Sequence, residues 1–125
     1  MRESTLWFWH LLAGAVILIL LALHMTIMHL DDLMVLLGLS HGDPIDQEIV
    51  FARSQQIFFM ITYILLLGAA LYHGLYGLRT ILFELTLSRA LEKAVNLILT
   101  VSGLALFAYG AYAAVVIYMM KEVQP

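Results

Sequence analysis

Residues 6–30 read LWFWHLLAGAVILILLALHMTIMHL and contain no Asp, Glu, Lys or Arg. As a helix, this stretch is longer than the roughly 20 residues needed to cross the hydrocarbon of a bilayer. Two further stretches, at about 54–84 and 91–120, are also largely apolar. The sequence therefore predicts an all-α membrane protein with three transmembrane helices, at about 6–30, 54–84 and 91–120, in a single domain over residues 1–125.

The composition of the whole chain agrees with a membrane location. Of its 125 residues, 63% are hydrophobic and 12% are charged, whereas an ordinary soluble domain is about half apolar and a quarter charged. The chain has no cysteine, which excludes disulfides and thiolate ligands, so any metal is expected to be held by histidine or carboxylate. The net charge of -3 and the scattered basic residues argue against nucleic-acid binding.

The segments between the spans are unequal. Residues 31–53 carry acids and turn formers and are expected to form a loop, with a short interfacial helix at 33–39. Residues 85–90 are expected to form a tight connection. The third span is rich in small residues, Gly103 and Gly110 among them, which predicts close packing against another helix.

The basic residues indicate how the chain lies in the membrane, because Lys and Arg near span ends are retained on the cytoplasmic side. Arg2 precedes the first span, and Arg79, Arg89 and Lys93 flank the connection between the second and third spans. Arg53 and Lys121 lie on the opposite side, where residues 31–53 also carry five acids. We therefore expect a multi-pass protein with a cytoplasmic N-terminus and a C-terminus outside.

Two of the five histidines, His24 and His73, lie inside apolar spans. A polar ring at that depth needs a partner, so an intramembrane histidine indicates a functional site by default. The alternative is a structural hydrogen bond to a neighbouring helix.

Both histidines share a helix face with a glycine. At 100° per residue, His24 lies on one stripe of the first span with Gly14 and His10. His73 lies on one stripe of the second span with Gly77. The absence of side-chain bulk fits a flat macrocycle lying against the backbone. We therefore predict His24 and His73 as axial ligands of haem iron, with Gly14 and Gly77 making room for the haem.

The expected depths of the two histidines separate their roles. His24 lies about 25 Å from the inner interface and His73 about 9 to 16 Å from it. Two axial nitrogens on one iron are only about 4 Å apart, so this pair is not expected to share a haem. Each would need a histidine from another chain, which predicts two haems b in a heteromeric helical bundle. Arg79 is expected to reach a carboxylate such as a haem propionate near the interface.

Residues 71–84, LYHGLYGLRTILFE, have Gly-Leu-Arg beginning four residues after His73 and end at Glu84, eleven residues after it. This stretch resembles the second helix of the small membrane anchor (cytochrome b) subunit of succinate dehydrogenase or fumarate reductase, also called complex II. The first span, where His24 follows His10 by fourteen residues, is similar to the first helix of di-haem members. The resemblance covers residues 6–120.

The resemblance implies a haem b-binding anchor that carries electrons between an iron–sulfur subunit and membrane quinone or menaquinone. It also implies a second anchor subunit, a flavoprotein subunit, and a place in the inner (plasma) membrane of a prokaryotic cell. The chain itself is expected to be a non-catalytic subunit of this oxidoreductase complex, because it contains no flavin or dinucleotide fingerprint.

One position departs from that family's pattern. Single-haem members have a quinone-binding tyrosine directly after the acid of the second helix, and Leu85 stands there in this chain. His10, Glu84 and Arg79 are the candidates for a quinone site, against the alternative that Glu84 and Arg79 are solvated charges at a helix end. Two other functions stay open: a cytochrome b subunit of another membrane-bound dehydrogenase or hydrogenase, and a purely structural membrane helper subunit.

Overall fold

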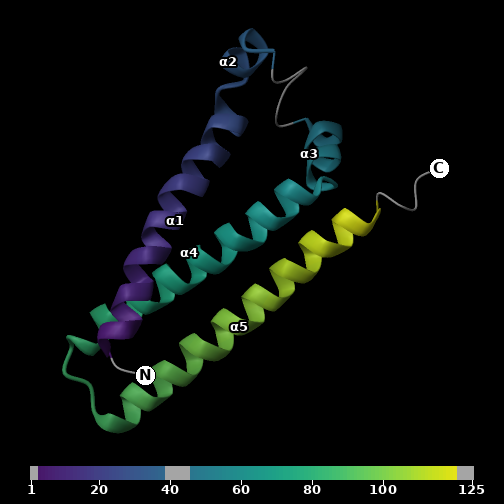
Figure 1. The fold of residues 1–125 in the computed structure, drawn as a ribbon. Helices are drawn as coiled ribbons and strands as arrows, with labels where there is room; N and C mark the ends of the chain where they lie inside the picture. The colour runs from purple at the N-terminus through teal and green to yellow at the C-terminus, as the bar shows by residue number, and fades with distance from the viewer. Residues whose placement is uncertain (1–2, 39–45, 121–125) are drawn as a thin grey trace.

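The computed structural model describes residues 3–38 and 46–120 (Figure 1). Within these ranges the chain forms five helices and no strand: α1 (Glu3–His29), α2 (Asp31–Leu36), α3 (Gln47–Ser54), α4 (Ile57–Phe83) and α5 (Arg89–Met119). Arg2, Lys121 and the turn formers at 40–44, on which part of the sequence interpretation depended, lie outside the described residues.

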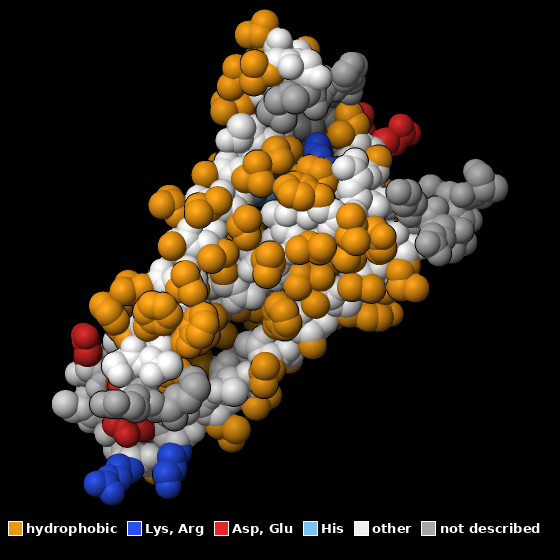
Figure 2. All heavy atoms as spheres, viewed as in Figure 1, with side chains coloured by type: hydrophobic (Ala, Val, Ile, Leu, Met, Phe, Trp, Pro, Cys, Tyr) orange, Lys and Arg blue, Asp and Glu red, His pale blue; other side chains and the backbone are white. Residues whose placement is uncertain are grey.

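Three of the helices are long and apolar enough to cross a membrane, over Glu3–Ile27, Ile57–Phe83 and Arg89–Met119. This confirms the prediction of an all-α chain with three spans and indicates a multi-pass membrane protein. Large apolar side chains stay exposed along all three helices, which suits lipid but not water. Figure 2 shows them over the visible face, with Lys and Arg gathered at the end of the molecule where α4 joins α5.

The helix boundaries differ from the expected ones in the segment before the second span. Residues 31–53 were expected to be a loop with one short helix, but a second helix, α3, occupies Gln47–Ser54. Its N-terminus is capped by Asp46, whose carboxylate accepts a hydrogen bond from the backbone N–H of Glu48 at 3.2 Å. The extended backbone of Gln56 (φ −93°, ψ 133°) then separates α3 from α4. The second span consequently begins at Ile57 rather than at about 54.

The connection between α4 and α5 is tight, as expected. Ser88 caps α5, its hydroxyl accepting a hydrogen bond from the N–H of Leu91 at 3.4 Å, so the third span begins at Arg89, two residues before the expected start. The interfacial helix that was expected at 33–39 is α2, which lies at Asp31–Leu36.

α4 is the central helix, and α1 and α5 both pack on it (Figure 1). The contact between α4 and α5 depends on glycines, because a Cβ on Gly103 would lie 2.6 Å from a methyl carbon of Leu75 and one on Gly68 would lie 3.2 Å from the ring of Phe107. Among the described residues only Ala13 and Arg53 are buried, and each is still 9% exposed. The three helices therefore form an open layer whose faces are left to lipid or to other chains.

Candidate functional site

His73 meets α1 at His10. The two imidazole rings are stacked, with their centroids 4.0 Å apart and their planes 6° from parallel. The Nδ1 atom of His73 lies 3.1 Å from the backbone carbonyl oxygen of His10. In a helix, the carbonyl of residue 10 points towards the N–H of residue 14. A ring that contacts the His10 carbonyl therefore also lies next to Gly14. A Cβ on Gly14 would lie 3.1 Å from Cε1 and 3.2 Å from Nδ1 of His73, so any larger residue there would push the ring by a few tenths of an ångström.

This contact fixes which nitrogen of His73 carries the proton. A carbonyl oxygen only accepts hydrogen bonds, so Nδ1 must be the donor. In the neutral ring, Nε2 is then unprotonated and keeps its lone pair. Histidines that ligate metals usually donate their other N–H to a carbonyl or carboxylate in this way. The contact therefore agrees with both interpretations of His73: it is the interhelical hydrogen bond of the structural alternative, and it leaves Nε2 unprotonated, as a metal ligand would need to be.

The stack of His10 on His73 does not form a pair of axial ligands. Axial imidazoles of one iron lie on opposite sides of the metal, whereas these rings lie face to face, 4.0 Å apart. The Nδ1 atom of His10 is buried and has no hydrogen-bond partner among the described residues. Such an atom is rare in a folded protein.

Gly14 and Gly77, which were predicted to make room for a haem, instead lie next to histidine rings of this chain. Gly14 makes room for the ring of His73, and a Cβ on Gly77 would lie 3.5 Å from Cε1 of His10. Gly74 is exposed, and a Cβ there would meet nothing within 4 Å. Within this chain, the side of α4 that carries Gly74 is therefore the one left open next to His73.

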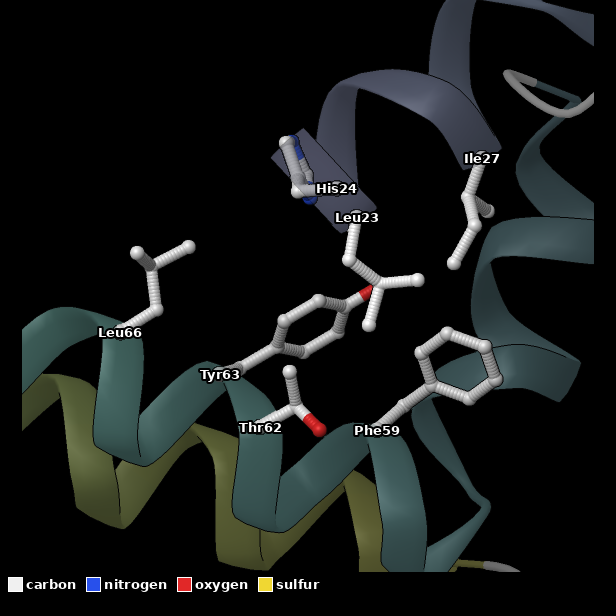
Figure 3. A pocket seen from close by; sticks show the side chains of 7 residues that line it. All are labelled: Leu23, His24, Ile27, Phe59, Thr62, Tyr63 and Leu66. Carbon is white, nitrogen blue, oxygen red and sulfur yellow. The ribbon is translucent and has the colours of Figure 1, made fainter. Parts of the chain in front are cut away.

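His24 lies farther along α1, opposite Tyr63 (Figure 3). The ring centroids of His24 and Tyr63 are 6.2 Å apart and the planes are 78° from parallel. The half-buried imidazole has no hydrogen-bond partner among the described residues. The pocket beside it holds about 10 Å³, room for about one water. Because Tyr63 precedes His73 by ten residues on α4, the two histidines lie at levels about 15 Å apart.

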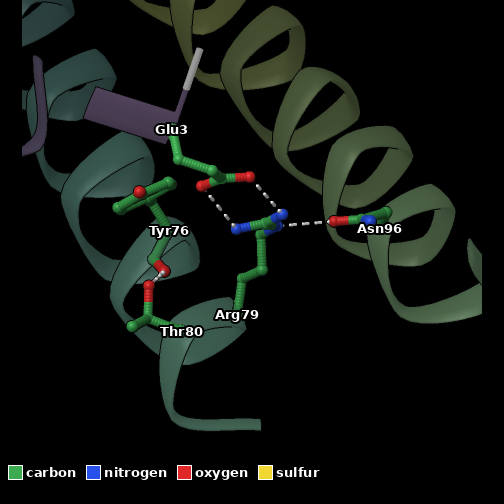
Figure 4. A network of polar contacts seen from close by, with 5 residues as sticks. All are labelled: Glu3, Tyr76, Arg79, Thr80 and Asn96. Atoms are coloured by element: carbon green, nitrogen blue, oxygen red, sulfur yellow. Dashed lines mark hydrogen bonds and ion pairs between the residues drawn. The ribbon is translucent and has the colours of Figure 1, made fainter. Parts of the chain in front are cut away.

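Arg79 joins all three long helices (Figure 4). Its Nε donates to Oδ1 of Asn96 on α5 at 2.7 Å, and its two terminal nitrogens face the carboxylate of Glu3 on α1 at 3.2 and 3.5 Å. The guanidinium also lies 4.4 Å from the ring centroid of Phe83. The carboxylate that Arg79 was expected to reach is thus found, within this chain, on Glu3.

The other candidates for a quinone site are not brought together. Glu84 forms the C-cap of α4, is exposed, and has no partner among the described residues. His10 is stacked on His73 and is not among the residues that line a groove between α4 and α5. The arrangement of Glu84 agrees with a solvated charge at a helix end.

That groove, of about 600 Å³, runs between α4 and α5 and was missed by the sequence analysis. Its polar lining residues include Tyr72, Tyr76, Arg79 and Asn96. The hydroxyl of Tyr72 donates to the backbone carbonyl of Leu6 at 2.8 Å, which ties the groove to α1. The spacing of Tyr72 and Tyr76, four residues apart, indicates from the sequence that both lie on one face of α4. Only the register of α4 against α5 shows that Asn96 lies beside Arg79.

The donor set fits haem better than a free metal ion. In the described part of the chain, no three His, Asp or Glu side chains gather closely enough to hold a metal. Haem iron needs from this chain only one axial nitrogen, because the porphyrin supplies four ligands. His73 and His24 each offer one.

Comparison of the chain with protein-family models, curated proteins and solved structures finds nothing that matches. The resemblance to complex II anchors therefore rests only on the sequence patterns described above and stays a prediction.

Proposed function

We propose that this chain is a haem b-binding membrane anchor subunit of a succinate:quinone oxidoreductase. It carries electrons between an iron–sulfur subunit and membrane quinone or menaquinone. Haem b supplies the electron-carrying chemistry, since its iron alternates between the ferrous and ferric states. The chain contributes axial nitrogens, an apolar surround and a scaffold for its partners, and takes no part in the oxidation of succinate itself.

The observation that carries this proposal is the hydrogen bond of His73. An imidazole whose Nδ1–H is held by the His10 carbonyl has its orientation and tautomer set for metal ligation through Nε2. Gly74 leaves the adjoining side of α4 open for a macrocycle and a second chain. His24, without a hydrogen-bond partner among the described residues, offers a second nitrogen about 15 Å away in level.

This arrangement requires a second anchor subunit. His73 and His24 lie too far apart in level to ligate one iron, and His10 is stacked beside His73 rather than opposed to it. We therefore propose two haems b, each with one ligand from this chain and one from the partner anchor. An iron–sulfur subunit and a flavoprotein subunit complete the complex on the side of Arg79, which we propose to be cytoplasmic.

The ligand assignment is tested by replacing the histidines one at a time and measuring haem in the purified complex. His24→Ala and His73→Ala should each remove about one haem and leave the other. Thr26→Ala and Thr80→Ala are matched controls on the same helices, because among the described residues each threonine hydroxyl bonds only a carbonyl four residues earlier in its own helix. Retention of both haems in both histidine variants would contradict the assignment, and loss of both haems in each single variant would contradict two separate sites.

The same preparation separates the proposed function from its rivals. A reduced complex without a b-type absorption band would support a purely structural helper, for which the His10–His73 contact would serve only packing. Haem without a co-purifying flavoprotein would favour a cytochrome b subunit of another dehydrogenase or a hydrogenase. Haem with a flavoprotein and an iron–sulfur protein is the result that we expect.

The proposed orientation is tested with cysteine labelling, since the chain has no cysteine of its own. Leu85→Cys reports on the α4–α5 connection, where the side chain is 64% exposed, and Gln47→Cys reports on α3, where it is also exposed. In intact cells, a membrane-impermeant maleimide should label position 47 and not position 85. The reverse pattern would show the opposite orientation.

A further inference from the structure

The groove between α4 and α5 is elongated, and its polarity changes along its length. Arg79 and Asn96 line one end, near the connection between the two helices. Beyond them the walls carry no charged residue and are mostly apolar as far as Gly68 on α4 and Phe107 on α5, interrupted by the hydroxyl-bearing Tyr76, Tyr72 and Thr100. On each helix this distance is eleven residues, or about 16 Å. Figure 2 shows the molecule hollowed between α1 and α5, towards the end where Lys and Arg gather.

The polar end of the groove carries more positive charge than its lining alone indicates. On α5, the lining residues Asn96, Thr100 and Gly103 lie on one stripe by their spacing. One acid, Glu92, precedes Asn96 by four residues on the same stripe. Two cations, Lys93 and Arg89, precede it by three and seven residues on this stripe and lie towards the helix end. Both are exposed. Cations from two helices therefore surround the mouth of an apolar slot.

Arg79 is arranged to hold a second oxyanion. Its 2.7 Å bond to Asn96 fixes the guanidinium at the mouth of the groove. Its contacts with Glu3, at 3.2 and 3.5 Å, are longer than the 2.7 to 2.9 Å of a strong charge-assisted bond. Glu3 itself is 69% exposed, so this pair is weak and open to exchange.

We propose that this groove binds an anionic glycerophospholipid, with one acyl chain along the apolar walls and the phosphate at Arg79 and Lys93. An acyl chain is the apolar ligand at hand in a bilayer, and basic pockets between transmembrane helices hold anionic headgroups. A zwitterionic lipid fits the apolar slot equally well but brings no net negative charge to the three cations. The groove thus selects the charge of the headgroup, independently of whether the chain binds haem.

The test counts lipids that stay bound to the purified complex, by native mass spectrometry after exchange into phosphatidylglycerol or phosphatidylcholine. We expect one retained phosphatidylglycerol, and about fivefold weaker retention in Lys93→Gln, which removes one cation. Glu48→Gln is the control, because it removes an exposed charge on α3, at the other end of the molecule from the groove mouth, and should leave the preference for phosphatidylglycerol intact. Inorganic phosphate, added as the headgroup alone, should not displace the lipid, since it lacks the acyl chain.

A second pair of variants tests the slot itself. Thr100→Phe fills the groove, whereas Val101→Phe adds the same bulk at the next position, which does not line the groove and is 56% exposed. Retention should be lost in the first variant and kept in the second, with both helical by circular dichroism. Equal retention of the two lipids, equal retention by the two phenylalanine variants, or displacement of the lipid by a soluble quinone analogue would each overturn the proposal. Haem content is measured on the same samples, so failure of this proposal is distinguishable from failure of the proposed function.

Discussion

Replacing Gly14 with alanine tests whether His73 is held where the structure places it. The new methyl carbon would lie 3.1 Å from Cε1 and 3.2 Å from Nδ1 of His73, closer than an ordinary van der Waals contact. The ring cannot withdraw without cost, because it is bonded to the His10 carbonyl at 3.1 Å and stacked on the His10 ring. The methyl group must therefore push the imidazole by a few tenths of an ångström and lengthen the Nδ1 hydrogen bond.

The expected magnitude follows from two opposed terms. Alanine is more favourable than glycine inside a helix by about 1 kcal/mol, and the hydrogen bond of His73 is worth about 1 kcal/mol. In Gly14→Ala these terms offset each other, and the net change is close to zero. In Gly74→Ala, where a Cβ meets nothing within 4 Å, only the gain remains. Gly77→Ala, with an ordinary 3.5 Å contact to His10, should behave like Gly74→Ala.

The difference between the Gly14 and Gly74 variants is the quantity to measure. Unfolding of the purified chain in mixed micelles, titrated with a denaturing detergent and followed by helicity, should separate them by about 1 kcal/mol. The nitrogen NMR resonance of His73 Nδ1 should shift in Gly14→Ala and stay in Gly74→Ala. If both variants are stabilised equally and the resonance does not move, the His73 ring does not lie over Gly14, and the register of α1 on α4 is wrong.

Two further predictions concern the contacts around Arg79 and Tyr72. In the same unfolding titration, Asn96→Ala should cost about 1.5 to 3 kcal/mol, because it removes a part-buried acceptor of a charged donor. Glu3→Gln should cost less than about 1 kcal/mol, because Glu3 is 69% exposed. The reverse order would contradict the geometry of Arg79. Tyr72→Phe removes only the bond to the Leu6 carbonyl and should cost about 0.6 to 1 kcal/mol; a variant as stable as the wild type would show that this bond is not formed.

The three spans could be predicted from the sequence because the signal for each is local. An uninterrupted apolar run longer than the bilayer is thick allows few alternatives to a transmembrane helix. α3, in contrast, is short and has no apolar run, so its sequence does not distinguish it from a loop. The cap at Asp46 was visible in the sequence, but a capping residue indicates a helix only where a periodic segment follows it.

The candidate site could be predicted only in part, for a different reason. Helical spacing places His10 and Gly14 on one face of α1, and His73 and Gly77 on one face of α4. It does not give the register between the helices, so the sequence could not show that Gly14 lies under His73. For the same reason, the partner of Arg79 was expected in a cofactor, whereas Glu3 and Asn96 lie within reach.

The contacts between α1 and α4 are distributed unevenly, and this bears on where a second chain is needed most. Near one end, hydrogen bonds from Tyr72 and His73 and the ion pair of Arg79 fix α4 to α1. At the level of His24, the contact is an edge-on approach to Tyr63 beside a small pocket. In Figure 1, α1 diverges from α4 in that direction. Because fewer contacts within this chain hold His24, we expect loss of the proposed partner anchor to disturb His24 before it disturbs His73.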